Sequence, residues 1–289
     1  TYALGMLPLV DENDKLHTVF RQAATSTGRL SSTEPNLQNI PVRKAEGALI
    51  RKLFIASPGN VLVTADYSQI ELRLMAHFSG DGAMCAAFNA GTDIHTVTAA
   101  KVFRVPEYMV TPEMRRHAKA VNFGIIYGIS EYGLAKDLGI SRARAREFIE
   151  GYFATYPGVK KYMNAAIETA KEKGYVQTLF GRRREVPELK AANANQRAFG
   201  ERVALNMPLQ GTASDIIKLA MLNAAAKLKE GGYASRLIMQ VHDELIIDAV
   251  PEEAEQMKKL LRDSMENVVQ LKVKLEVEVG SGPNWLEAK

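Results

Sequence analysis

The stretch from Val61 to Glu71, VLVTADYSQIE, constrains the fold of this chain more than any other. A short apolar, β-branched run leads into Asp66, and a helical pattern begins directly after it. Short apolar runs bounded by polar residues are typical of buried strands. We therefore expect the carboxylate of Asp66 to lie at the end of a buried strand, on a rigid element.

A second acidic residue occurs in a similar setting far along the chain. In residues 237–250, LIMQVHDELIIDAV, two apolar runs flank His242-Asp243, which predicts a hairpin with Asp243 and Glu244 near its tip. We expect Asp66 and Asp243 to meet across adjacent strands and to hold divalent metal ions, because Mg²⁺ prefers carboxylate oxygens. Taken alone, the His242-Asp243 pair is equally well read as a hydrogen-bonded turn.

Bulk composition excludes several classes of protein. The chain has 289 residues, of which 46% are hydrophobic, and this is enough to form a large core. The net charge of +4 is compatible with a phosphate-rich partner. The single cysteine, Cys85, excludes an internal disulfide framework, and no apolar run approaches the roughly 20 residues of a membrane span. Because the chain opens on Thr1, we expect it to be part of a longer protein.

The most informative helix is predicted between Thr111 and Tyr127. Thr111-Pro112 forms an N-cap followed by a first-turn proline, and Gly128 ends the helix. Along one face, two cations and then two aromatic residues recur every four positions, and these are Arg115, Lys119, Phe123 and Tyr127. Such a row suits a nucleoside triphosphate, with cations on the phosphates and rings against the sugar and base. A solvated basic face with two rings in the core is the alternative.

The remaining pattern predicts an α+β fold with a helical insertion, because strands come from both ends of the chain. The polar residues 25–43 predict a loop, either a surface connection or a binding loop. A helical stretch at 195–231 should kink or split at Pro208, and alternating residues at 271–279 predict a half-exposed final strand.

Three long segments resemble the signature motifs of family A DNA polymerases, the bacterial polymerase I type. They are DYSQIELR at 66–73, RRHAKAVNFGIIYG at 115–128 and VHDE at 241–244. Residues 27–32, TGRLSS, and 35–41, PNLQNIP, resemble the template–primer loop of that family. The resemblance implies a nucleotidyltransferase of DNA replication and repair. It would add dNMP to a primer 3′-hydroxyl by two-metal-ion phosphoryl transfer and release pyrophosphate.

The resemblance also implies catalytic roles. Asp66 and Asp243 would hold two Mg²⁺ ions, for which Mn²⁺ could substitute, and Tyr67 would contribute its backbone carbonyl. Glu244 would support the site beside the primer end. Lys119 would protonate the departing pyrophosphate.

A second set of residues is implied to bind the incoming dNTP. His95, Arg115 and Lys119 would bind the triphosphate, and Phe123 would stack on the nucleotide. Glu71 would close the space beside the sugar 2′ position and disfavour ribonucleotides. The whole set is Tyr67, Gln69, Glu71, His95, Arg115, Lys119, Phe123 and Tyr127.

A third set is implied to bind DNA. Arg29, Gln210 and His242 would contact the primer or the nascent pair in the minor groove, where acceptor positions are common to all correct pairs. Tyr127 would lie beside the templating base. The DNA-binding set is Arg29, Asn36, Gln38, Asn39, Arg43, Arg202, Gln210 and His242.

In family terms, residues 1–75 and 205–289 would form an antiparallel-sheet palm that carries the carboxylates. Residues 76–204 would form mostly helical fingers. The thumb and any exonuclease domain lie upstream in the family and are expected to precede this chain in the full-length protein. The implied partners are primer–template DNA and dNTP, with no membrane. We expect a monomer in a bacterial or phage-like cytoplasm, associated with the nucleoid.

Rival functions remain open at this point. A polymerase that copies RNA, as a reverse transcriptase does, or a single-subunit RNA polymerase would use the same chemistry; Glu71 and Phe123 favour synthesis from deoxynucleotides but do not reveal the template. A metal-dependent phosphodiesterase also uses paired acids, although it needs no triphosphate-binding helix. The last rival is a catalytically silent DNA-binding module.

Overall fold

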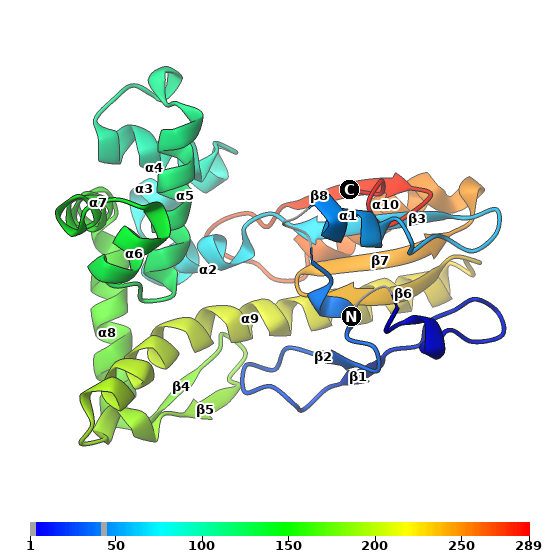
Figure 1. The fold of residues 1–289 in the computed structure, drawn as a ribbon, viewed down its shortest axis with the longest axis horizontal. Helices are drawn as coiled ribbons and strands as arrows, with labels where there is room; N and C mark the ends of the chain where they lie inside the picture. The colour runs from blue at the N-terminus through cyan, green and yellow to red at the C-terminus, as the bar shows by residue number, and fades with distance from the viewer. Residues whose placement is uncertain (1–3, 42–44) are drawn as a thin grey trace. The chain divides into compact units, whose positions relative to one another are not determined.

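The computed structural model describes residues 4–41 and 45–289, and it divides into two compact units. The first, here the sheet unit, comprises the residues up to Ser68 together with 214–269 and 275–289. The second, here the helical unit, comprises 69–213 and 270–274. The divisions lie near residues 68 and 214, where the sequence predicted 75 and 205. Figure 1 shows the elements of both units.

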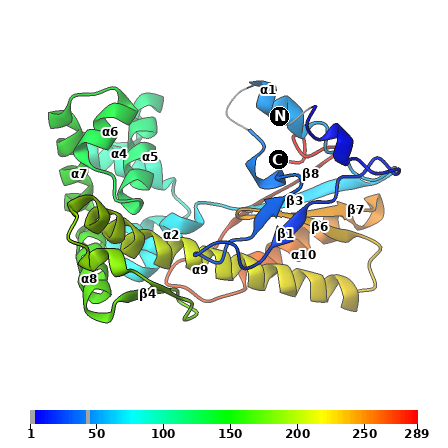
Figure 2. The ribbon, with the colours of Figure 1, turned by 60° about the horizontal axis from the view of Figure 1, so that its bottom comes forward.

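The sheet unit is built on an antiparallel four-stranded sheet in the order β6-β7-β3-β8. Its strands are β3 (Val61–Tyr67), β6 (Arg236–Val241), β7 (Glu244–Ala249) and β8 (Val277–Gly282). Helix α10 (Ala254–Glu266) packs on one face of the sheet (Figure 2). There the Tyr67 hydroxyl donates to the Met265 carbonyl at 2.7 Å. This sheet, combined with many helices, confirms the predicted α+β class.

The opposite face of the sheet carries the acidic residues. Side chains alternate between the faces of a strand, so Leu62, Thr64 and Asp66 point away from Tyr67 and helix α10. Leu62 packs into a core with Ile246 and the fully buried Trp285. The remaining elements of this unit are η1 (Leu7–Leu9), β1 (Val19–Arg21), β2 (Ser31–Thr33), η2 (Leu37–Asn39), α1 (Ala45–Arg51) and η5 (Pro251–Glu253).

Short regular elements interrupt the segment that the sequence predicted as a loop. Strand β2 pairs with β1 in antiparallel fashion, and Asn36 caps η2, because its side chain accepts from the Gln38 backbone N–H. Within β2, Ser32 is buried, and its hydroxyl lies 2.6 Å from that of Thr18. Hydrogen bonds to residues distant in sequence therefore order a stretch whose composition alone indicates a turn-rich loop.

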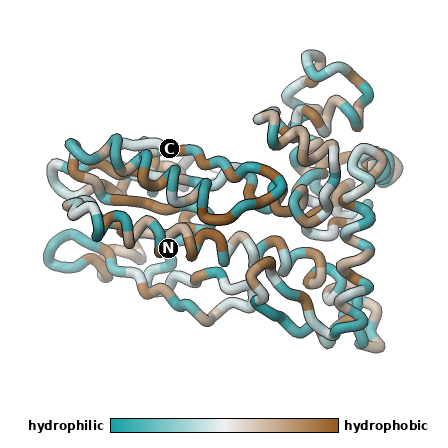
Figure 3. The backbone as a smooth tube through the Cα atoms, turned by 180° about the vertical axis from the view of Figure 1, so that it is seen from behind, coloured by the Kyte–Doolittle hydropathy of each residue, from teal (hydrophilic) through white to brown (hydrophobic). Residues whose placement is uncertain are grey.

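The helical unit contains α2 (Ile70–Ser79), α3 (Gly82–Asn89), α4 (Ile94–Phe103), η3 (Glu107–Met109), α5 (Pro112–Ile126), α6 (Glu131–Leu138), α7 (Arg142–Thr155) and α8 (Pro157–Lys173). The hairpin β4 (Tyr175–Gln177) and β5 (Arg183–Glu185) follows, with η4 (Pro187–Lys190). Hydrophilic and hydrophobic residues are interspersed along these helices (Figure 3). No helix among the described residues is both long and apolar enough to cross a membrane.

Helix α9 (Ala194–Glu230) contributes to both units and continues through Pro208. The sequence predicted that Pro208 would kink or split this helix; the split is wrong, because one helix runs through the proline. A proline inside a helix removes one hydrogen bond and costs about 3 kcal/mol. The neighbours Met207, Leu209 and Ala213 are buried, so tertiary packing offsets that cost.

The predicted strand at 271–279 is also wrong in its bounds, because β8 begins only at Val277. Residues 270–274 belong to the helical unit. There the Lys272 N–H donates to His77 Nδ1 at 3.1 Å, while Asn89 binds the Lys272 carbonyl and the Lys274 N–H. Side chains of α2 and α3 satisfy this backbone in place of a neighbouring strand.

Gly280 provides a test of how tightly the segment after β8 packs. A Cβ added at Gly280 would lie 2.2 Å from the Ala288 carbonyl oxygen. We expect Gly280→Ala to lower the free energy of unfolding by about 1–3 kcal/mol in urea denaturation. Gly82→Ala is the matched control, because no heavy atom of the described residues, apart from its chain neighbours and its own helix backbone, lies within 4 Å of an added Cβ. Equal denaturation midpoints for the two variants would contradict this packing.

Candidate active site

Three acidic residues gather where β3 ends and β7 begins. Asp66 of β3 lies directly opposite Glu244, the first residue of β7. The Tyr67 N–H donates to the carbonyl of Asp243 at 3.1 Å, which brings the turn against the end of β3. His242-Asp243 forms the two-residue turn between β6 and β7, as the predicted hairpin requires. His242 has φ of 53°, an uncommon value for a residue other than glycine.

Cationic side chains of the chain itself approach these acids. Lys289 Nζ lies 3.1 Å from Asp66 Oδ2 and 3.0 Å from Glu244 Oε2. Arg29 Nη2 lies 4.0 Å from Asp243 Oδ1. The carboxylates at this end of the sheet therefore already attract positive charge.

Glu244 is the most buried of the three acids, with 2% of its surface exposed. Its Oε1 accepts a hydrogen bond from Trp285 Nε1 at 3.0 Å. Burial raises the pKa of Glu244, although Lys289 opposes the shift. Burial also acts on Lys289, but the attraction of Glu244 and Asp66 outweighs it and raises the pKa of the ammonium.

The donor set fits a hard divalent cation. Asp66 and Asp243 offer carboxylate oxygens, and the Lys289 ammonium acts as a stand-in cation at Asp66. Within 4–41 and 45–289, no group of three or more His, Cys, Asp or Glu side chains could hold a metal by itself. Mg²⁺ takes one or two carboxylates and completes its shell with phosphate oxygens and water, so this pair suits a metal that binds together with substrate.

Helix α5 of the helical unit follows its predicted pattern. The Thr111 hydroxyl accepts from the Met114 N–H at 3.2 Å, and Gly128 after the helix has φ of 68°. Ala118, Val121 and Ile125 are buried, whereas the predicted cationic and aromatic row is exposed or half-buried. The exposed row leaves Arg115 and Lys119 accessible to a ligand.

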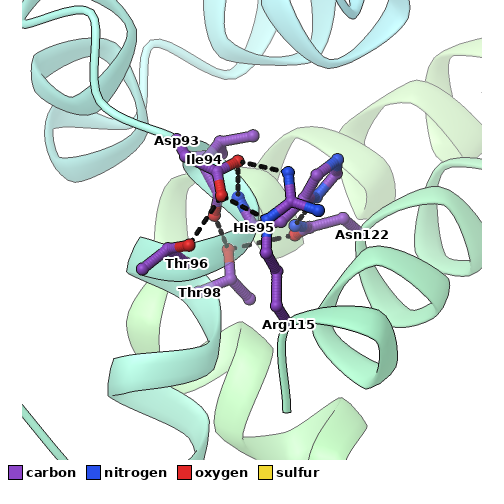
Figure 4. A network of polar contacts seen from close by, with 7 residues as sticks. All are labelled: Asp93, Ile94, His95, Thr96, Thr98, Arg115 and Asn122. Atoms are coloured by element: carbon purple, nitrogen blue, oxygen red, sulfur yellow. Dashed lines mark hydrogen bonds and ion pairs between the residues drawn. The ribbon is translucent and has the colours of Figure 1, made fainter. Parts of the chain in front are cut away.

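A polar network joins α5 to the start of α4 (Figure 4). Arg115 donates to both oxygens of Asp93, at 2.6 and 3.2 Å. Asp93 also accepts from the His95 N–H and the Thr96 hydroxyl, and the pKa of its carboxyl falls to about 2, because these hydrogen bonds outweigh the effect of burial. Arg115 is therefore positioned by an acid that the sequence analysis did not identify.

His95 is held in the same network as a neutral ring. Its Nδ1 lies 2.9 Å from Asn122 Nδ2, and its ring is 5.7 Å from that of Phe123. Burial lowers the pKa of His95 to about 4; Asp93 opposes the shift, and Arg115 and Lys119 reinforce it. With Asn122 donating to Nδ1, the Nε2–H is left as a donor, so His95 suits a hydrogen bond to a phosphate rather than a charge on it.

The depressed pKa of His95 makes stability pH-dependent. Because the unfolded chain binds the proton more readily, stability falls as the pH drops from about 6.5 to about 4, by roughly 2–3 kcal/mol. We expect urea denaturation at a series of pH values to show this loss of unfolding free energy. An NMR titration of the His95 ring should have its midpoint near pH 4. His95→Gln should flatten the dependence in this window. An unchanged slope in His95→Gln would contradict the assignment.

Glu71 and Tyr127 act on each other. The Tyr127 hydroxyl donates to Glu71 Oε2 at 2.5 Å, and Glu71 is 6% exposed. The sequence predicted separate roles for the two residues. The hydrogen bond means that a change in one side chain alters the position of the other.

The remaining predicted residues are distributed over both units. In the sheet unit Gln38 Nε2 donates to Gln240 Oε1 at 3.1 Å, and Asn39 is exposed. In the helical unit Gln69 precedes α2 in a left-handed conformation, and α9 carries the exposed Arg202 and the half-buried Gln210. Arg43 lies outside the described residues.

Sequence reasoning missed several residues around the acids. Lys289 and Trp285 contact Glu244, and Arg51 Cζ lies 4.1 Å from the centre of the Trp285 ring. Glu278 of β8 pairs with Asp66 on its other side. The one available signal was that Trp285 is the only tryptophan of the chain.

An acidic hairpin on an antiparallel sheet, in a chain with a cationic and aromatic helix, suits a protein that handles nucleotide phosphates. The family model for DNA polymerase family A matches residues 1–287. The chain therefore belongs to DNA polymerase family A.

Named relatives agree with this assignment. The chain is 52% identical over its whole length to "DNA polymerase I" of Caldicellulosiruptor bescii and 54% identical to "DNA polymerase I" of Bacillus caldotenax. It spans 34% and 33% of the length of these relatives. Among solved structures, the "POL domain of Pol1 from M. smegmatis complex with DNA primer-template and dNTP" is similar over 98% of this chain and 50% of its own, with a TM-score of 0.95 and 47% identity.

Proposed function

We propose that this chain carries the site of a template-directed DNA polymerase, which adds dNMP to a primer 3′-hydroxyl and releases pyrophosphate. The main support is the cluster of Asp66, Asp243 and Glu244 on adjacent strands, in a chain that belongs to DNA polymerase family A. The solved relative bound to DNA primer-template and dNTP supports the same partners for this chain. In this proposal the sheet unit is the palm and the helical unit is the fingers.

Asp66, Asp243 and the Tyr67 carbonyl would hold two Mg²⁺ ions, or Mn²⁺ in their place, which when bound help activate the attacking hydroxyl and stabilise the leaving oxygen. Glu244 is buried and accepts a hydrogen bond from the Trp285 indole. It would therefore support the site from the protein interior. Positioning and charge stabilisation then account for the catalysis, since phosphoryl transfer asks little covalent chemistry of the protein.

The exposed face of α5 would bind the incoming nucleotide. Arg115, held by Asp93, and Lys119 would bind the triphosphate, and neutral His95 would donate from Nε2. Lys119 would also give a proton to pyrophosphate. Phe123 would stack on the nucleotide. The hydrogen-bonded pair of Glu71 and Tyr127 would limit the space beside the sugar 2′ position.

The DNA would be read by shape. Arg29, His242 and Gln210 would donate to minor-groove acceptors that all correct pairs share, so that base choice comes from template pairing. Asn36, Gln38 and Asn39 would position the strand backbone, as would Arg202. We also propose a role in DNA replication and repair and a cytoplasmic, nucleoid-associated location. In the longer protein, a thumb or exonuclease region would lie upstream of this chain.

Primer extension on a primed DNA template with Mg²⁺ and four dNTPs tests the proposal. Template-dependent elongation that stops when one dNTP is withheld is the expected result. Shortening of the primer would instead identify a phosphodiesterase. Binding of DNA without elongation would identify a silent binding module, and preferential copying of an RNA template would identify a reverse transcriptase.

A further inference from the structure

The segment after β8 carries a cation directly into the acidic cluster. Asn284 forms an antiparallel β-bridge with Ile55. The backbone N–H of Trp285 donates to the Phe54 carbonyl at 2.9 Å, and the Thr64 hydroxyl donates to the Ala288 carbonyl at 2.7 Å. These contacts bind the segment to the sheet unit on both sides of Trp285. In Figures 1 and 2 the end of the chain lies near β8 and α1. The backbone is therefore held as far as Ala288, the residue before Lys289.

The ammonium of Lys289 bridges two acids that have different surroundings. Glu244 has only 3% of its side chain exposed, while the side chain of Asp66 is 43% exposed. Nζ lies within 3.1 Å of an oxygen of each. A buried carboxylate without a partner is costly, so the ammonium stabilises Glu244 in the absence of a metal ion.

We propose that Lys289 is the resident counter-cation of the acidic cluster and competes with a divalent ion for Asp66. This inference rests on the proposed function, because it takes Asp66 as a metal ligand. A divalent ion bound at the same carboxylate would be repelled by an ammonium a few ångströms away. Lys289 therefore weakens metal binding to the enzyme without nucleotide, and the negative charge of a triphosphate offsets that repulsion. The metal is thereby favoured to enter together with its nucleotide.

The test is a titration of the full chain with Mn²⁺, followed by electron paramagnetic resonance, without DNA or nucleotide. We expect Lys289→Met to bind Mn²⁺ about tenfold more tightly than the unmodified chain, and Lys289→Arg, which keeps the charge, to bind it equally. Lys52→Met is the matched control. Lys52 pairs with Glu287 of the same segment, 3.4 Å away, and its loss should leave Mn²⁺ affinity unchanged.

Two outcomes would overturn the inference. Unchanged Mn²⁺ affinity in Lys289→Met, with circular dichroism showing a folded chain, would exclude competition. Weaker binding would show that Lys289 positions Glu244 for the metal instead.

The variant Asp66→Asn distinguishes failure of the competition between Lys289 and the metal from failure of the proposed function. If Asp66→Asn abolishes Mn²⁺ binding and Lys289→Met does not alter it, only the competition is wrong. If Asp66→Asn binds Mn²⁺ normally, the metal site itself is wrong.

Discussion

Alanine at Asp66 or at Asp243 is expected to reduce primer extension by at least about a thousandfold, with DNA affinity changed less than about threefold. Both residues lie where β3 meets the β6–β7 turn, and neither is part of the buried apolar core. Each variant therefore loses a proposed metal ligand without leaving a cavity. Single-turnover extension and fluorescence anisotropy with primed DNA measure the two quantities.

Glu255→Ala provides the control for loss of a carboxylate in the sheet unit. Glu255 is exposed on α10 and pairs only with Lys258 among the described ion pairs. Its replacement should leave extension within about twofold, since exposed ion pairs contribute little. Near-normal turnover in Asp66→Ala or Asp243→Ala would count against the metal assignment.

Lys119→Ala is expected to lower kcat/KM for dNTP by about a hundredfold, while the affinity for DNA changes less than about twofold. Lys119 is exposed on the face of α5 that also carries Arg115 and Phe123. His95 is neutral and adds no charge to this face, so Lys119 supplies positive charge there. Pre-steady-state incorporation at varied dNTP concentration measures the loss.

Arg116→Ala is the matched control on the same helix. Arg116 precedes Lys119 by three residues, which places the two about 60° apart around α5. Its side chain is 72% exposed and pairs with Glu113 in the first turn. Its loss should change dNTP use less than about threefold. Equal losses in Arg116→Ala and Lys119→Ala would mean that general positive charge, rather than a placed ammonium, attracts the nucleotide. Equal losses of dNTP and DNA affinity in Lys119→Ala would also argue against its phosphate role.

Local signals predicted the elements on which the site is built. The β-branched run before Asp66 gave strand β3, and the hairpin around His242-Asp243 is present with a two-residue turn. Helix α5 starts at Pro112 after its Thr111 cap, as predicted. Each of these features depends on residues close together in sequence, which is why pattern reasoning succeeded.

Features that depend on distant contacts could not be predicted in this way. Nothing near Lys289 in the sequence indicates that its ammonium binds Asp66, more than 200 residues away. Likewise, alternation at 271–274 resembles a strand, but side chains from α2 and α3 bind that backbone instead. Pro208 shows the same limit, because packing around α9 outweighs a local cost.

The most direct test of the central claim is a crystal structure of the chain with primer–template DNA, a nonreactive dNTP and Mg²⁺. We predict two ions, with carboxylate oxygens of both Asp66 and Asp243 at about 2.1 Å from metal and phosphate oxygens completing the shell. Ions bound elsewhere, or Asp66 and Asp243 sharing no metal ion in a complex with nucleotide bound, would contradict it.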